Sequence, residues 1–192
     1  MHSPQILALT KTGRPIQWID VEAAIVYHAK DMVKWSLGDS SITLHGGTNR
    51  VTGNQSQLTT ASIIAIDGDF KKQRKFNVTR QLVFRRDLHV CAFCGQSFLD
   101  RDLSVDHINP KYHGGQDSWM NLVTACKPCN HRKANRTPEE ARMPLLYVPY
   151  EPNVNEAFIL SNRRILADQM DFLINSGISK HSRIREYAAS FN

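Results

Sequence analysis

Two C-x-x-C pairs constrain the fold of this chain more than any other feature of its sequence. Cys91 and Cys94 form the first pair, and Cys126 and Cys129 form the second. Each pair can hold a metal ion from a tight turn, and two such turns complete a tetrahedral site of four thiolates, which is typical of structural zinc. Unpaired buried thiols rarely occur twice with the same spacing. The sequence therefore predicts a closed Zn²⁺ site that ties two distant segments together.

Treating the cysteines as metal ligands requires a reducing compartment. The first residues, 1–5, lack the basic start and apolar stretch of a secretion signal, and no apolar run approaches the ~18 residues of a membrane span. We therefore expect a cytoplasmic protein with no membrane partner, in which thiols stay reduced. A chain of 192 residues is long enough to bury a core without disulfides.

Basic residues concentrate on both sides of the cysteine pairs, within a net charge of +6. Residues 71–90 hold seven lysines and arginines against the single acid Asp87. A second basic group begins within the second cysteine pair and continues beyond Cys129. A solvated surface would explain either cluster alone, but two clusters around one metal motif favour a polyanion partner. Five residues are predicted to contact a nucleic-acid backbone in a salt-sensitive way: Arg85, Arg86, Arg132, Lys133 and Arg136.

The predicted fold class is α+β, in four segments. These are a β-rich N-terminal unit with one helix at 1–70, a basic linker at 71–80, a metal-binding module at 81–143, and an extended segment with C-terminal helices at 144–192. In the first segment we expect strands at 5–9, 41–44 and 57–66, a helix at 21–30 capped by Asp20, and a turn around 45–49. In the last we expect one helix at 153–175, with Ile159, Leu166, Met170 and Leu173 on one face, and a short helix at 182–190.

An Asp–His pair lies between the two cysteine pairs. Residues 103–106 are predicted to form a short strand, and Asp106 and His107 can face one centre only where that strand ends. Asn109–Pro110 and Gly114–Gly115 supply the loop that follows. A return strand at 122–125 and a helix from Pro128 to about residue 135 complete the pattern strand, loop, strand, helix. Residues 137–140 match a capping box that opens another helix.

These motifs resemble the HNH endonucleases, whose catalytic unit is called ββα-metal. The resemblance lies in Asp106–His107, in Asn121 within Trp-Met-Asn-Leu, and in the stretch from Cys129 to Lys133, and it covers about residues 84–143. The two C-x-x-C pairs are similar to the zinc-bearing branch of that family. The resemblance implies that residues 81–143 form a zinc-braced ββα-metal HNH module, which lies between the β-rich N-terminal unit and the C-terminal helix predicted above. It also implies a protein of a bacterial or phage-infected host cell.

The resemblance also implies a role for each site residue. His107 would be the general base, and Asp106 with Asn130 would hold one Mg²⁺ or Mn²⁺ ion, giving 5′-phosphate and 3′-hydroxyl ends. Asn121 would fix the orientation of His107 through loop contacts. Asn130 stands where the family often has histidine, and its amide oxygen suits these cations. His131 is the other candidate ligand, although it points about a quarter turn away on a helix.

The leading hypothesis is therefore a metal-dependent DNA endonuclease or nickase. The alternative is a non-catalytic zinc-ribbon module that binds nucleic acid. A purely structural zinc protein would leave the Asp106–His107 pair unexplained. The sequence does not separate nicking from double-strand cleavage, and a homodimer stays open because paired nicking needs two active sites or their equivalent. The target sequence and the biological role, whether restriction, phage packaging, a mobile element or repair, also stay open.

Overall fold

The computed structural model describes residues 5–68 and 76–189, and its contacts divide the chain into two units. The first unit comprises Met1–Lys75 and Asn162–Gly177, and the second comprises Phe76–Ser161 and Ile178–Asn192. Each unit therefore combines two separate stretches of the chain. The predicted linker at 71–80 falls partly outside the described residues.

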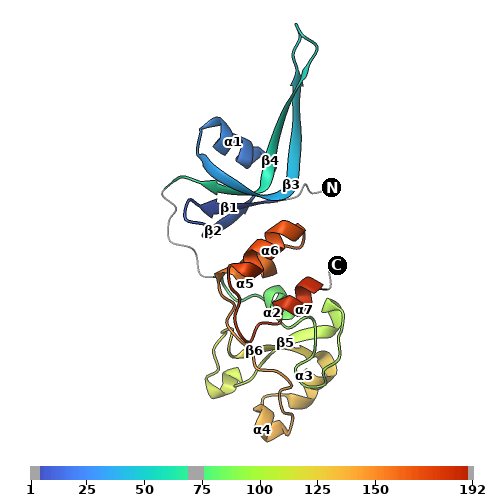
Figure 1. Cartoon of the computed structure of the whole chain (residues 1–192). Helices are drawn as coiled ribbons and strands as arrows, with labels where there is room; N and C mark the ends of the chain where they lie inside the picture. The colour runs from blue at the N-terminus through green and yellow to red at the C-terminus, as the bar shows by residue number, and fades with distance from the viewer. Residues whose placement is uncertain (1–4, 69–75, 190–192) are drawn as a thin grey trace. The chain divides into compact units, whose positions relative to one another are not determined.

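The first unit is a four-stranded sheet with two helices (Figure 1). Its elements are β1 (Ile6–Thr10), β2 (Pro15–Ile19), α1 (Val21–Ala29), β3 (Val33–Thr48), β4 (Gln55–Ile66) and α6 (Ala167–Asn175). The strand order is β2-β1-β4-β3, with β1 parallel to β4 and the other pairs antiparallel. Apolar residues of β1 and β4, including Ile6, Ala8 and Ile64, pack against Val21 and Ala24 of α1.

The β3–β4 hairpin is longer than the sequence predicted. Gly46 and Gly47 suggested a turn at 45–49, but both lie in β3, where their carbonyls accept hydrogen bonds from side chains of β4. The reversal comes later, where Asn49 Oδ1 accepts from the backbone N–H groups of Val51 and Thr52 at 2.8 and 3.1 Å. Cross-strand hydrogen bonds thus override the local flexibility of the two glycines. Strand β2 was not predicted.

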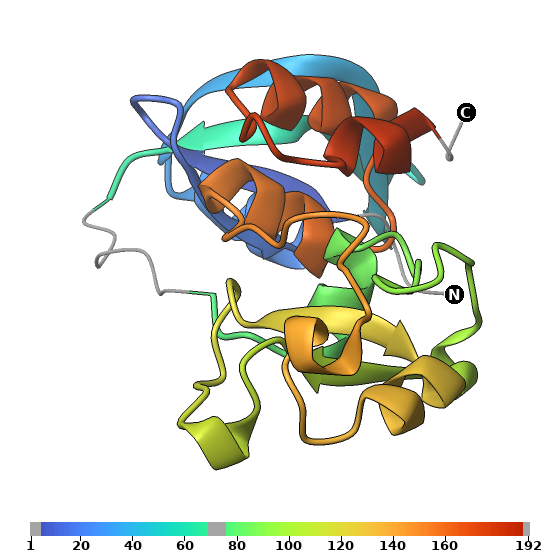
Figure 2. The ribbon, with the colours of Figure 1, turned by 90° about the horizontal axis from the view of Figure 1, so that it is seen from below.

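The second unit contains the predicted strand, loop, strand and helix, which confirms the α+β class. Its elements are α2 (Arg80–Arg86), the 3₁₀ turns η1 (Asp100–Asp102) and η2 (Lys111–His113), β5 (Leu103–His107), β6 (Leu122–Cys126), α3 (Lys127–Lys133), α4 (Pro138–Ala141), α5 (Val154–Ser161) and α7 (Ile184–Ala189). Strands β5 and β6 lie side by side and antiparallel, and α3 follows β6 directly (Figures 1 and 2). The predicted capping box is present at the start of α4.

The single helix predicted at 153–175 is wrong. The structure has α5 in the second unit and α6 in the first. Between them, Asn162 Oδ1 accepts from the Arg164 N–H at 3.0 Å, and Gln169 Oε1 accepts from the Leu166 N–H at 3.0 Å. These side chains replace helical backbone hydrogen bonds and interrupt the helix.

Arg86 joins α2 to the rest of the second unit. It is 1% exposed, and its guanidinium pairs with both carboxylate oxygens of Asp87 at 2.8 and 3.1 Å. It also donates to the backbone carbonyls of Trp119, Leu122 and Tyr150. The sequence placed Arg86 among the nucleic-acid contacts. The structure corrects that assignment, because the guanidinium is buried and its N–H groups donate to acceptors inside the second unit.

Candidate active site

The four cysteines form one cluster at the base of the β5–β6 hairpin. Cys91 and Cys94 lie in a turn closed by the Gly95 N–H, which donates to the Cys91 carbonyl at 2.9 Å. Cys126 ends β6, and Cys129 lies in the first turn of α3. All four sulfur atoms lie within 4.8 Å of one another, and only Cys94 is exposed. Four free thiols at this spacing are the donor set of a structural zinc site.

The thiols are not placed to ionise independently. Burial raises the pKa of Cys126 and of Cys129, and for Cys129 the neighbouring thiols add to the effect. Burial also opposes ionisation of Cys91, but nearby backbone N–H groups, led by that of Cys126, outweigh it and lower the pKa. A cation held by all four sulfurs would offset the cost of gathering thiolates here.

A separate pocket lies at the end of β5. It has a volume of about 320 Å³, and Asp106, His107 and Asn130 all line it. Asp106 is opposite Val123 in the hairpin, and His107 is the last residue of β5. The end of the strand thus lets adjacent residues reach one cavity. The pocket lining does not include Asn121 or His131.

Asp106 is a buried carboxylate held by Lys133. Asp106 is 6% exposed and Lys133 is 0% exposed. Lys133 Nζ lies 3.2 Å from Oδ1 and 2.9 Å from Oδ2, and it donates to the His107 carbonyl at 2.8 Å. Oδ2 is nonetheless buried with no hydrogen-bond partner in good geometry among the described residues. Burial raises the pKa of Asp106, and Lys133 opposes that rise.

Lys133 is the second basic residue whose predicted role the structure corrects. It was expected to touch phosphates at the surface. Its ammonium group is instead enclosed between Asp106 and the end of β5, so it acts within the pocket wall.

Asn130 is oriented by Ser104. Asn130 Nδ2 donates to the Ser104 hydroxyl at 2.7 Å, and that hydroxyl donates to the Ala125 carbonyl at 3.1 Å. The amide nitrogen is therefore committed to β5. No group in the described ranges donates to Asn130 Oδ1, which leaves this oxygen for a ligand in the pocket.

His107 pairs with an acid that the sequence analysis did not identify. Its Nε2 lies 2.6 Å from Asp117 Oδ1, and Asp117 Oδ2 accepts from Lys111 Nζ at 2.9 Å. The hydrogen bonds from His107 and then Lys111 hold the pKa of Asp117 below its usual range. The one sequence signal was an acid just beyond the Gly114–Gly115 loop, and nothing local tied it to His107.

Asn121 closes the loop between the two strands. Its Oδ1 accepts from the Asn109 N–H at 2.8 Å, and its Nδ2 donates to the carbonyls of Asn109 and Gln116 at 3.1 and 2.9 Å. None of these hydrogen bonds reaches the imidazole of His107. Gly115 is packed so tightly in this loop that an added Cβ would lie 1.8 Å from the Asn109 carbonyl oxygen.

Comparison with known families agrees with this geometry. Residues 91–146 match the model of the HNH endonuclease family, from the first zinc-type cysteine to just beyond α4. Residues 91–146 are an HNH endonuclease domain. The family is one of phosphodiester hydrolases, so the domain implies nuclease activity on a nucleic-acid substrate. A search of curated proteins found no match.

The predicted nucleic-acid contacts Arg132, Arg136 and Arg85 differ in their exposure to solvent. Arg132 and Arg136 lie at the surface at the end of α3, and Arg136 donates to the carbonyls of Arg132 and Lys133 at 2.6 and 3.2 Å. Arg85, just before the domain, is partly buried and donates to the Leu160 carbonyl at 2.5 Å. In the part of the chain that the structure describes, no helix is long and apolar enough to cross a membrane.

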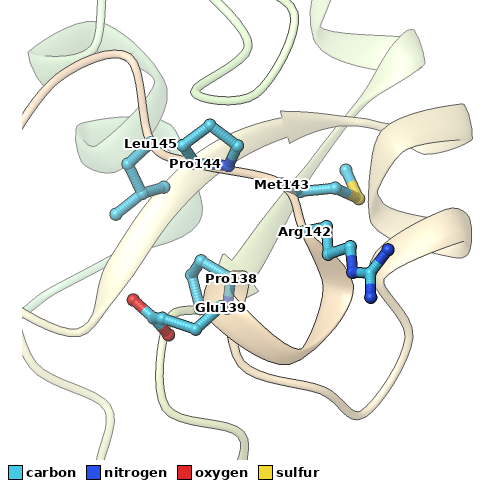
Figure 3. Close-up of a pocket in the computed structure, with 6 residues that line it drawn as sticks. All are labelled: Pro138, Glu139, Arg142, Met143, Pro144 and Leu145. Atoms are coloured by element: carbon cyan, nitrogen blue, oxygen red, sulfur yellow. The ribbon is translucent and has the colours of Figure 1, made fainter.

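A second pocket of the HNH domain lies beside α4 and has a volume of about 460 Å³. Figure 3 shows its lining, in which Glu139 and Arg142 point in different directions from a largely apolar wall. The full lining is Pro138, Glu139, Arg142, Met143, Pro144 and Leu145. It contains none of the predicted catalytic residues. Asp106, His107 and Asn130 line the smaller pocket instead.

Proposed function

We propose that the HNH domain hydrolyses DNA phosphodiester bonds with one divalent cation, leaving 5′-phosphate and 3′-hydroxyl ends. The observation that carries this proposal is the convergence of Asp106, His107 and Asn130 on one pocket of about 320 Å³. A carboxylate, an imidazole and an amide in one open cavity supply an oxygen-rich cation site beside a proton acceptor.

Asp106 and Asn130 would hold the cation. Asp106 Oδ2 is buried and ion-paired with Lys133 Nζ at 2.9 Å, but it accepts no well-aligned hydrogen bond among the described residues, and Asn130 Oδ1 receives no donor there. Both are oxygen donors of the kind that Mg²⁺ and Mn²⁺ prefer. When bound, the cation would neutralise the scissile phosphate and stabilise the departing 3′ oxygen.

His107 would accept a proton from the attacking water. A neutral imidazole can do so near neutral pH, and His107 keeps 21% of its side chain accessible at the pocket. Lys133 would keep the Asp106 carboxylate in place through its ion pair. Asn121 would hold the loop that carries the acidic partner of His107.

The four cysteines would hold Zn²⁺ as a brace. Cys129 directly precedes Asn130, so fixing its sulfur also fixes the start of the helix that presents Asn130. We take 81–143 as the catalytic module, because α2 is locked to β6 through Arg86. Arg132 and Arg136 are the exposed candidates for contacts with the DNA backbone.

The test is cleavage of supercoiled and linear DNA with Mg²⁺ or Mn²⁺, followed by end mapping. We expect the wild type to cut and His107→Ala to lose at least 100-fold in rate, because general-base catalysis contributes about that much or more. His45→Ala, an exposed histidine of the first unit, is the matched control and should cut like the wild type.

Equal cutting by the wild type and His107→Ala would remove His107 from its role. A wild type that binds DNA but never cuts it would favour the non-catalytic zinc-ribbon module instead.

A further inference from the structure

The hydrogen bond between His107 and Asp117 defines which nitrogen of the ring can act as a base. An ionised carboxylate can only accept hydrogen bonds. At 2.6 Å, the Asp117 Oδ1 therefore requires the proton on His107 Nε2. In the described part of the chain, no group forms a hydrogen bond with His107 Nδ1. The remaining lone pair of the neutral ring is thus on Nδ1.

We infer that Asp117 is a positioning residue for His107, which holds the imidazole in the Nε2–H tautomer and leaves Nδ1 to accept the proton from water. This inference rests on the proposed function of His107 as the general base. Asp117 does not line the pocket, so it acts through the imidazole and not as a ligand of the cation.

The backbone on both sides of Asp117 is fixed by Asn121. The Asn121 side chain donates to the Gln116 carbonyl at 2.9 Å, and its backbone N–H donates to the Ser118 carbonyl at 3.1 Å. Asn121 therefore clamps the residues directly before and after Asp117. This arrangement gives Asn121 a route to the orientation of His107 without touching its ring.

Lys111 completes the arrangement from the other side of the loop. Its Nζ donates to Asp117 Oδ2 at 2.9 Å while Oδ1 accepts from His107. Each carboxylate oxygen thus has one committed donor, which fixes the plane of the group. An ordinary surface ion pair would contribute little to stability. Since the Asp117 side chain is 61% exposed, we expect its loss to affect the tautomer of His107 and not the folding of the domain.

The tautomer can be measured without any cleavage. In the full chain with its cysteine site loaded with Zn²⁺ and ¹⁵N-labelled histidines, two-bond ¹⁵N–¹H correlations at pH 8.5 separate the tautomers. His107→Gln identifies the His107 signals. We expect the Nε2–H form in the wild type and in Asp117→Glu, and a mixture in Asp117→Ala. An Nδ1–H ring in the wild type, or identical signals in the wild type and Asp117→Ala, would overturn the inference.

Kinetics provide the second measurement. Asp117→Ala should lower kcat by roughly 10-fold to 100-fold with KM unchanged, by analogy with the loss of a hydrogen-bond partner of a metal-ligating histidine. Asp117→Glu should recover part of the rate. Asp102→Ala is the matched control, because Asp102 is also exposed and forms a surface ion pair, with Arg101. If Asp117→Ala does not fold, Asp117→Asn takes its place, and a mixed tautomer is again expected.

The two measurements separate this inference from the proposed function. A change of tautomer in a protein that never cuts DNA would support the positioning role and reject the nuclease mechanism. Cleavage that depends on His107 but is unchanged in kcat by Asp117→Ala would overturn the positioning role alone.

Discussion

At the scale of single residues, burial decides which basic side chains are available to a nucleic acid. Arg86 and Lys133 are 1% and 0% exposed, and both bind carboxylates inside the second unit. Arg132 and Arg136 come from the same basic stretch of sequence as Lys133 but lie at the surface. Lysines and arginines of one cluster therefore divide into internal counter-ions and candidate phosphate contacts.

Replacing Lys133 by methionine tests the internal role. The variant leaves the buried Asp106 carboxylate without the ammonium group of Lys133. The free energy of unfolding should therefore fall by about 3–5 kcal/mol. Urea denaturation of Zn²⁺-loaded protein measures the change. Arg132→Met, next in sequence and exposed, should change it by less than about 0.5 kcal/mol. Equal stability of the two variants would contradict the counter-ion role.

At the scale of elements, α6 is attached to the sheet of the first unit by polar side chains. Asp168 Oδ2 accepts from the Ser62 hydroxyl at 2.7 Å and from the Ser40 N–H at 3.0 Å, and Gln169 donates to the Ser62 carbonyl at 2.8 Å. Gly38 allows this approach. Its φ is +105°, and an added Cβ would lie 2.4 Å from Asp168 Oδ2. A glycine in β3 thus leaves space for the acid of a distant helix.

The stability conferred by Asp168 should depend on pH. Burial raises its pKa, but the hydrogen bonds from Ser62, Ser40 and Gln169 outweigh burial and leave the pKa below its usual value. Because the folded pKa is the lower one, the stabilisation is present above the unfolded pKa of about 3.9 and is lost as pH falls through the folded pKa.

Asp168→Asn isolates the charge of this carboxyl. At pH 6 the variant should be less stable than the wild type by about 1 kcal/mol, less than the roughly 1.5–3 kcal/mol of a hydrogen bond to a charged group because Asp168 is partly exposed. As pH falls through the folded pKa of Asp168 the two proteins should converge, because the carboxyl is then protonated. Urea denaturation over a series of pH values from 6 downwards measures the difference. A gap that stays constant with pH would show that the charge does not matter.

At the scale of the whole molecule, the chain builds each unit from two separated stretches. It leaves the first unit, forms the HNH domain and α5, contributes α6 to the first unit, and returns to the second. The last stretch of the second unit is held to α5 by the buried Glu156, whose carboxylate accepts hydrogen bonds from the Ser179 N–H and hydroxyl at 2.9 and 2.7 Å. The cysteine cluster likewise brings the Cys91–Cys94 turn together with the end of β6 and the start of α3.

Cys94→Ser is a sharp test of the metal brace. Cys94 is the exposed member of the cluster, so without a metal the change would be a minor surface substitution. With Zn²⁺ bound by four thiolates, it should lower zinc content and unfold the HNH domain, because binding is coupled to folding. Zinc analysis and thermal denaturation, with and without chelator, measure this. An unchanged melting temperature and zinc content would contradict the four-thiolate site.

The sequence alone determined the features that depend on short-range pattern. The C-x-x-C pairs, the Asp–His pair at a strand end and the capping box at 137–140 each involve neighbours, so spacing was sufficient to identify them. Their order along the chain also identified the family that residues 91–146 match. The break between α5 and α6 was not predicted, because apolar residues at helical spacing continue from one helix into the other. The two helices belong to different units, which the local sequence does not indicate.

Only the tertiary structure decided how charged groups are paired. Arg86 donates a hydrogen bond to the carbonyl of Tyr150, which is distant in the sequence. Lys133 forms an ion pair with Asp106, and His107 forms a hydrogen bond with Asp117 across a loop. The partner of a buried charged residue cannot be identified from the residues next to it in the sequence. The free-energy cost of burying the charge is offset by groups that only folding brings near. Spacing therefore selected the candidate catalytic residues, whereas the groups that hold those residues in place depend on contacts between distant parts of the chain.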